Sequence, residues 1–363
     1  MSILFEKTII NGMILQNRFV RSATWEGMAG GDGFVTDPLR TLMADLASGG
    51  VGLIITGHAY VAKVGQATPG QLAVDRDECI PGLASMADAV HHAGGRIVLQ
   101  LAHAGQRASR KLTGELPMGP SAVDGDKDEL CRAMTVDDIE KTCEAFSDAA
   151  RRAREAGFDG VQIHAAHGYL LSEFLSAPFN RREDAYGYDR GGRMRMVREV
   201  YRSVRDSVGE AYPVLIKVNA SDFVEGGVTI DDTIALSSLL YEDGIDAVEL
   251  SGGTHRSGAN IPSRVGQETA EREAYYRSEA KRFKETLPVP LILVGGIRSF
   301  DIAEGLVRDG VTDYIALSRP LVREPDLVNR WKAGNRERAR CISDSLCLKK
   351  ALSGAIVCVH LDE

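Results

Sequence analysis

Short apolar segments recur eight times along the chain, and each is followed by a stretch long enough to form a crossover helix. The eight segments are residues 19–23, 51–56, 96–101, 160–164, 214–219, 247–251, 290–294 and 314–317. Most of them are almost entirely apolar, which is typical of parallel strands that are buried on both faces. The alternation therefore predicts an α/β fold, a (β/α)8 TIM barrel in which helices surround eight parallel strands.

Turn and cap signals support this division of the chain. Residues 5–10 and 13–15 flank Asn11-Gly12, a dipeptide suited to a tight two-residue turn, so an N-terminal β-hairpin is expected. Two helices are predicted to start at a capping box, in which a threonine is followed three positions later by an acidic residue. The two pairs are Thr135 with Asp138 and Thr229 with Asp232.

Three connections that follow predicted strands are unusually long, and they cover residues 103–134, 165–190 and 252–268. Loops of this length in a compact domain are commonly functional, and in a barrel all of them leave the strands at the same end. The active site is therefore expected at that end. An open, doubly wound sheet is the structural alternative, but no glycine-rich dinucleotide motif follows the first strand.

Composition and charge narrow the classes of function. Hydrophobic residues make up 44% of the 363 residues and charged residues 26%, a balance typical of a globular protein with a large core. The formal net charge of -8 does not suit a nucleic-acid surface, and no segment approaches the ~20 apolar residues of a membrane span. We therefore expect a cytoplasmic protein that acts on small molecules. Residues 1–363 are expected to form a single barrel with a short C-terminal extension from about residue 335.

The segment at the end of the fourth predicted strand carries the most informative side chains. His164 and His167 lie three positions apart, and Tyr169 follows them closely. Two histidines at this spacing can share a metal ion, although no third ligand follows at a recognisable spacing. They can also be held by local hydrogen bonds. The interpretation that we favour is a pair of donors for an oxygen that gains negative charge, with Tyr169 as a nearby acid.

Several segments share their order and spacing with one known family. They are His164-x-x-His167-Gly168-Tyr169, residues 174–187, Asn17-Arg18-Phe19-Val20, Gln100-Leu101-x-His103-x-Gly105, Val294-Gly295-Gly296-Ile297 and Ala316-Leu317-x-Arg319-Pro320-Leu321. Together they resemble the old yellow enzyme family of FMN-dependent ene-reductases over nearly the whole chain. The resemblance implies a TIM barrel that binds FMN, takes NADH or NADPH as co-substrate and reduces an alkene conjugated to a carbonyl group.

The resemblance also implies roles for individual residues. His164 and His167 would hydrogen-bond the carbonyl oxygen of an α,β-unsaturated substrate, where fixed donors stabilise developing negative charge. Tyr169 would deliver a proton to the α-carbon. Gln100 would bind the pyrimidine edge of the flavin. Lys217 would place a cation beside that edge, where the family usually has arginine, so it keeps the charge and loses the forked geometry.

The loops after the last two predicted strands suit the phosphate of the cofactor. Gly295 and Gly296 follow the seventh strand, and Ser318 and Arg319 follow the eighth. Barrels commonly build a phosphate site from these two loops, with backbone N–H groups and a helix N-terminus. Taken alone, this pattern fits many phosphate-binding barrels, and together with the two flavin-binding side chains above it favours FMN.

The resemblance is least regular near the first two strands. Ala23 and Thr24 are assigned to the cofactor site, together with Gly57 at the end of the second strand. The family often has threonine or cysteine at the position that aligns with Trp25, and a shift of one residue would put Thr24 there. Which of these two side chains faces the flavin is left open.

Three of the six cysteines, Cys341, Cys347 and Cys358, lie close to the C-terminus. Larger relatives in this family hold an iron–sulfur cluster on four cysteines just past the barrel. Here Asp344 stands where the second cysteine would fall, so only three thiolates are in frame for a four-thiolate cluster. We therefore expect FMN without an iron–sulfur cluster and no other metal, and structural thiols are the alternative role of these cysteines.

The leading hypothesis is thus an NAD(P)H:FMN oxidoreductase of the ene-reductase type. Two rival hypotheses stay open. One is a phosphate-binding lyase or isomerase barrel without flavin, and the other is a flavin-binding relative without catalytic activity. Barrels of this family often form homo-oligomers, so self-association is also expected, whereas no nucleic-acid or membrane partner is.

Overall fold

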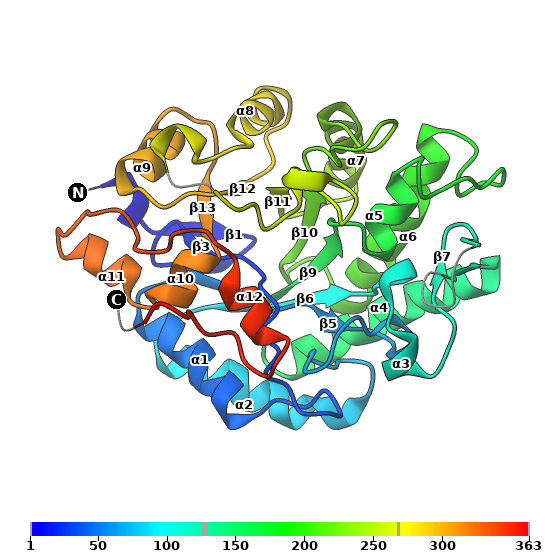
Figure 1. Cartoon of the computed structure of the whole chain (residues 1–363), viewed down its shortest axis with the longest axis horizontal. Coiled ribbons are helices and arrows are strands. Elements are labelled where there is room, and N and C mark those ends of the chain that lie inside the picture. The colour runs from blue at the N-terminus through cyan, green and yellow to red at the C-terminus, as the bar shows by residue number, and fades with distance from the viewer. Residues whose placement is uncertain (1, 125–129, 267–268, 362–363) are drawn as a thin grey trace.

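The computed structural model describes residues 2–124, 130–266 and 269–361, and within them eight parallel strands form a closed barrel (Figure 1). The strands are β3 (Phe19–Arg21), β4 (Leu53–Ile55), β6 (Ile97–Ala102), β9 (Gly160–Ala165), β10 (Val214–Asn219), β11 (Ala247–Ser251), β12 (Leu291–Val294) and β13 (Tyr314–Leu317). Each pairs with the next in parallel, and the pairing of β13 with β3 closes the ring. The predicted TIM barrel is confirmed.

Helices follow the strands in chain order and cover the outside of the barrel (Figure 1). The longer ones are α1 (Asp37–Ser48), α2 (Ile80–His92), α4 (Val136–Glu155), α6 (Arg190–Val208), α7 (Ile230–Glu242), α8 (Arg277–Thr286) and α9 (Phe300–Arg308). Shorter ones are α3 (Arg110–Thr113), α5 (Leu170–Leu175), α10 (Arg319–Arg323), α11 (Leu327–Lys332) and α12 (Leu346–Ala351). Among the described residues, no helix is long and apolar enough to cross a lipid bilayer.

Helix α4 shows how the sequence sets these elements. Its buried residues include Ile139, Thr142, Phe146, Ala149 and Ala153. This spacing of three and four puts them on one face of the helix, which packs toward the barrel. The predicted capping boxes are confirmed at the first turns of both α4 and α7, where the threonine hydroxyl accepts from a backbone N–H and the aspartate carboxylate accepts from the N–H of the threonine.

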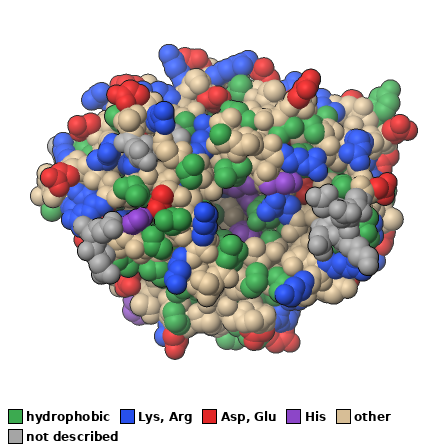
Figure 2. Space-filling view, in the orientation of Figure 1, with side chains coloured by type: hydrophobic (Ala, Val, Ile, Leu, Met, Phe, Trp, Pro, Cys, Tyr) green, Lys and Arg blue, Asp and Glu red, His purple; other side chains and the backbone are tan. Residues whose placement is uncertain are grey.

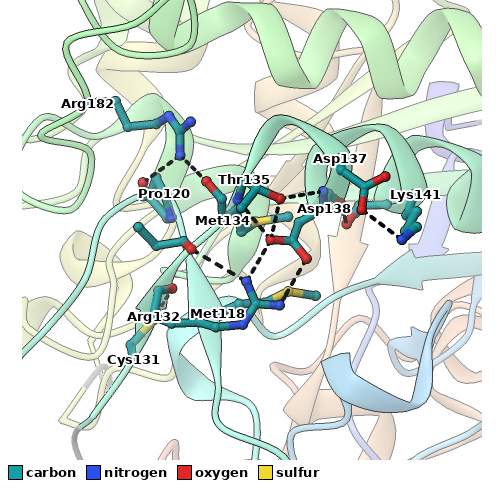
Figure 3. Close-up of polar contacts among 12 residues, drawn as sticks. Met118, Pro120, Cys131, Arg132, Met134, Thr135, Asp137, Asp138, Lys141 and Arg182 are labelled. Atoms are coloured by element: carbon teal, nitrogen blue, oxygen red, sulfur yellow. Dashed lines mark hydrogen bonds and ion pairs between the residues drawn. The ribbon is translucent and has the colours of Figure 1, made fainter.

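The long connection between β6 and α4 is held in place by hydrogen bonds next to the first turn of α4. Its two short strands, β7 (Met118–Gly119) and β8 (Arg132–Ala133), pair in parallel, and Arg132 forms an ion pair with Asp138 at 2.6 and 2.9 Å (Figure 3). Arg182 of the connection between β9 and α6 donates to the carbonyls of Pro120 and Met134. Two of the three long connections therefore hold each other. Parts of the first and third connections, residues 125–129 and 267–268, lie outside the described residues.

The predicted hairpin is present as β1 (Thr8–Ile10) and β2 (Met13–Leu15), joined by a turn in which Asn11 and Gly12 both have positive φ. Phe5 belongs to a 3-10 turn (Ile3–Phe5) that precedes the hairpin, so the first strand is shorter than predicted. The buried face of the hairpin packs against the barrel interior in one apolar cluster. That cluster includes Ile10, Met13, Leu15, Val20, Leu53, Val98, Leu215 and Ile292.

The segment that follows α11 returns to the barrel. Helix α12 lies in front of the strand ends in Figure 1, and Ser343 and Leu348 of this segment line the main cavity. One further short strand, β5 (Ala59–Tyr60), extends the sheet beside β6. The predicted C-terminal extension therefore contributes to the wall of the cavity at the carboxyl end of the strands.

Candidate active site

A cavity of about 250 Å³ opens at the carboxyl ends of the barrel strands, the end at which the sequence predicted the site. Figure 2 shows the hollow near the centre of this face, with histidine side chains around it. Ten of the twelve predicted site residues line the cavity. These are Ala23, Thr24, Gln100, His164, His167, Tyr169, Lys217, Gly296, Ser318 and Arg319.

A tight reversal after β9 brings the two histidines and the tyrosine together. His167 and Gly168 both have positive φ, at 65° and 73°, a conformation that costs a non-glycine residue free energy. The His167 N–H donates to Asn219 Oδ1 at 3.2 Å, which holds this turn. The centroid of the His164 ring lies 5.3 Å from the centroid of the His167 ring and 5.0 Å from that of the Tyr169 ring.

The two imidazoles have different hydrogen-bond environments. His167 Nε2 lies 2.8 Å from Ser251 Oγ, whereas the buried Nδ1 of His164 has no hydrogen-bond partner among the described residues. Buried polar atoms are normally satisfied, so an orphaned ring nitrogen on a cavity wall is suited to a ligand. Burial lowers the pKa of both rings well below the usual range, and the nearby cation of Lys217 acts in the same direction. Both rings are therefore neutral at physiological pH.

Sequence reasoning missed His58, which lies next to Tyr169 in the cavity wall. Its Nε2 is 3.4 Å from Tyr169 Oη, and the two ring centroids are 5.3 Å apart. Burial lowers the pKa of His58 to about 4, with a smaller effect from the Arg107 cation. Burial raises the pKa of Tyr169, and Arg107 opposes that shift. A signal was present, because His58 is the first side chain with a titratable group after an apolar strand.

A chain of buried polar side chains connects Gln100 with Lys217. Gln100 Nε2 donates to Gln162 Oε1 at 2.7 Å, and Gln162 Nε2 donates to Glu249 Oε2 at 2.8 Å. Lys217 Nζ donates to the other carboxylate oxygen of Glu249 at 3.0 Å, and Ser22 Oγ donates to that same oxygen at 2.6 Å. The cation that the sequence predicted inside a strand therefore has a buried partner.

The strand register explains this network. Gln100 pairs with Gln162 between β6 and β9, and Lys217 pairs with Glu249 between β10 and β11. Residues in register on neighbouring parallel strands point to the same face of the sheet, which here is the barrel interior. Sequence reasoning missed Gln162 and Glu249, although each interrupts an apolar strand as clearly as Lys217 does.

Thr24 and Trp25 both line the cavity, so the choice between them stays open. Thr24 Oγ1 lies 2.7 Å from Ser318 Oγ and donates to the carbonyl of Ser22. Trp25 packs, as Leu348 does, against the apolar cluster of Cys347, Ala351 and Ile356, and its buried Nε1 has no partner among the described residues. Trp25 therefore lies in the cavity wall beside the C-terminal segment, which also contributes Leu348 to that wall.

Gly57 and Gly295 are the two predicted site residues that are not among the lining residues. The Gly57 N–H donates to Glu26 Oε1 at 3.1 Å, and a Cβ at this glycine would lie 2.2 Å from the Glu26 carboxylate. A Cβ at Gly295 would approach the rings of Tyr275 and Tyr276 at 3.0 Å. Both glycines thus allow close packing behind the wall, and their contact with a cofactor stays a prediction.

Arg319 ties the predicted phosphate end to the C-terminal segment. Its Nη1 donates to the carbonyls of Arg264 and Ser343 and to Ser345 Oγ, at 2.8, 3.1 and 2.8 Å. In the described structure these three bonds all use Nη1, which leaves the other guanidinium N–H groups for a ligand. The conformation of this loop is therefore supported by residues well beyond the barrel strands.

Cys341, Cys347 and Cys358 line one small hollow behind Arg319, together with Asp344 and His360. All three are free thiols, and burial raises the pKa of Cys341 and Cys347. Asp344 Oδ2 lies 2.8 Å from His360 Nε2, within hydrogen-bond distance. The described residues contain no arrangement of three or more histidine, cysteine or acidic side chains suited to a metal ion. The absence of an iron–sulfur cluster stays a prediction.

The donor set of the cavity fits FMN. The pyrimidine ring of a flavin presents one N–H between two carbonyls, and Gln100 uses its amide Nε2 for Gln162 and so keeps Oε1 for that N–H. Lys217 adds a buried cation beside it, and Ser318, Arg319 and Gly296 supply polar groups for a phosphate on the other side of the cavity.

The fold and this donor set define a flavin-binding (β/α)8 barrel. Residues 3–338 match the model of the NADH:flavin oxidoreductase / NADH oxidase family, and the chain belongs to that family. Membership confirms the family that the sequence predicted. A solved structure described as an old yellow enzyme homologue from Zymomonas mobilis superposes with a TM-score of 0.78 at 26% identity, over 94% of this chain and 95% of that one.

Curated relatives are of two lengths. The chain is 34% identical to an NADH oxidase of Thermoanaerobacter brockii over 94% of its own length and 52% of that protein. It is 35% identical to an NADPH dehydrogenase of Geobacillus sp. (strain WCH70) over 89% of its own length and 92% of that protein. The chain therefore spans about half the length of the first curated relatives it matches and nearly the full length of others.

The buried imidazoles predict an acid-sensitive fold. Burial lowers the pKa of both His58 and His103 from 6.5 to about 4. At pH values between 4 and 6.5 the unfolded chain binds protons on these histidines that the folded protein does not bind. The free energy of unfolding should therefore fall as the pH falls from 6.5 to 4. Above pH 6.5 it should not depend on these two groups. Each ring accounts for up to about 3 kcal/mol.

His103 tests this expectation because it lies outside the cavity lining. Urea unfolding of the wild type and of His103→Gln at pH 7.0, 5.5 and 4.5 should show a weaker pH dependence in the variant, by roughly one proton. Parallel curves for the two proteins would contradict the assignment. Carboxylates that titrate in the same range affect both proteins alike and cancel in the comparison.

Proposed function

We propose that the protein is an NAD(P)H-dependent, FMN-containing reductase of alkenes conjugated to a carbonyl group. The observation that carries the proposal is the convergence of His164, His167 and Tyr169 on a cavity that also holds Gln100 and Lys217. Bound FMN would carry a hydride from the nicotinamide to the β-carbon of the alkene. The same cavity would accept both substrates in turn, so ping-pong kinetics are expected.

The neutral imidazoles of His164 and His167 would hold the carbonyl oxygen of the alkene. Charge grows on this oxygen as the β-carbon is reduced, and preorganised donors in a buried site stabilise such charge by roughly 3–4 kcal/mol each. Neutral rings suit this role because they keep an N–H to donate without adding a second cation beside Lys217. Tyr169 would give its phenolic proton to the α-carbon.

The proposal is tested by following the visible absorbance of the purified protein under anaerobic conditions. NADH or NADPH should bleach the flavin band, and cyclohexenone should then restore it. A colourless protein would favour the flavin-free lyase or isomerase barrel. A yellow protein that responds to neither reagent would favour a flavin-binding relative without catalytic activity.

A further inference from the structure

We propose that His58 positions the phenol of Tyr169 and returns a proton to it during turnover, an inference that rests on the proposed reduction of a conjugated alkene. His58 comes from the loop after β4, and Tyr169 from the turn after β9, so the two meet only through the closure of the barrel. The distance between His58 Nε2 and Tyr169 Oη is 3.4 Å, with the two rings tilted by 33°.

The reaction creates a need for such a group. When Tyr169 gives its proton to the α-carbon, a phenolate remains in a buried site. Burial raises the pKa of this phenol, which means that the phenolate is disfavoured there and a nearby N–H donor stabilises it. His58 Nε2 is placed to serve as such a donor, beside the Arg107 guanidinium, which also hydrogen-bonds the phenol.

The proton balance is simple. A hydrogen bond from His58 Nε2–H to Tyr169 Oη leaves the phenolic O–H free to point at the substrate. After transfer, the Nε2–H bond breaks and a new O–H bond forms on Tyr169, while His58 Nδ1 takes a proton from water. The ring then loses the Nδ1 proton to solvent and gains a solvent proton on Nε2, which restores the starting tautomer. One solvent proton is consumed, and no electrons move in these steps.

The surroundings of His58 suit a neutral relay. His58 is 8% exposed, against 3% for His164, whose ring centroid is 6.4 Å away. The charged group that acts on it is Arg107, an exposed residue that also acts on Tyr169. A cation at this position keeps the imidazole neutral and so keeps the cycle between its two tautomers available.

The test compares two electron acceptors. Reoxidation of the reduced holoenzyme by cyclohexenone needs a proton on carbon, whereas reoxidation by ferricyanide does not. In His58→Ala the ratio of the two steady-state rates should fall about 100-fold, at the lower end for a proton-transferring group. Added imidazole should restore the ratio in proportion to its concentration. His103→Gln is the matched control, because it removes a buried imidazole that does not line the cavity, and it should leave the ratio unchanged.

A second measurement does not depend on turnover. The ¹⁵N chemical shifts of the His58 ring in the oxidised holoenzyme should report the tautomer with the proton on Nε2 and no titration at neutral pH. Three results would each overturn the inference. One is a His58 proton fixed on Nδ1, and another is an unchanged rate ratio in His58→Ala. The third is a loss of rate that is equal for both acceptors and that added imidazole does not reverse. Failure of cyclohexenone to reoxidise the wild-type enzyme would instead overturn the proposed function and this inference with it.

Discussion

Replacing Tyr169 with phenylalanine is expected to slow reoxidation of the reduced enzyme by cyclohexenone roughly 10²- to 10⁴-fold, the range for loss of a positioned proton donor. The substitution removes one hydroxyl and keeps the ring that packs 5.0 Å from His164 and 5.3 Å from His58. The loss should therefore appear in the alkene half-reaction, which stopped-flow absorbance at the flavin band measures directly.

Tyr276→Phe is the matched control for this experiment. Tyr276 is also a buried tyrosine, but it does not line the cavity. Its substitution should leave alkene reduction within a few-fold of the wild-type rate. If the two substitutions had similar small effects, Tyr169 would not be the proton donor, and another acid would have to be sought near the α-carbon.

The second large effect concerns the buried pair of Lys217 and Glu249. Both side chains are almost fully buried, and Nζ lies 3.0 Å from the carboxylate oxygen. Glu249→Ala leaves a cation in the barrel interior without its counter-charge, and breaking such a pair costs about 3–5 kcal/mol. We expect this loss in the free energy of unfolding, measured by urea denaturation with FMN removed from every variant so that ligand binding does not contribute.

The double variant Lys217→Met with Glu249→Leu is the control. It removes both charges and fills similar volume, and replacing a buried ion pair in this way is often close to neutral. Its free energy of unfolding should therefore lie much nearer the wild type than that of Glu249→Ala. Equal losses in the two variants would indicate that packing at these positions, rather than the unpaired charge, controls stability.

Much of the candidate site could be read from local pattern. His164, Lys217 and Gln100 are polar residues in or at the ends of apolar strands, and a barrel gathers such strand ends at one face. The approximate position of each strand follows from short runs of apolar residues, which depend only on neighbours in the sequence. For the same reason the capping boxes of α4 and α7 were predicted correctly.

The pairings across the barrel could not be read in this way. His58 and Tyr169 are 111 positions apart, and Lys217 and Glu249 are 32 apart. Their contacts depend on which residue of one strand lies beside which residue of the next, and a shift of one position turns a side chain from the interior to the outside. His58 was missed because its contact with Tyr169 depends on how the barrel closes and not on its neighbours in the sequence.

The sequence by itself therefore determined the order of strands and helices, the caps and the set of polar groups available at the strand ends. Only the tertiary structure decided that Glu249 neutralises Lys217, that His58 contacts Tyr169 and that Trp25 and Leu348 both line the cavity. The physical reason is that secondary structure follows from local periodicity, whereas the closed ring of strands sets its register through hydrogen bonds and packing between residues far apart in the chain.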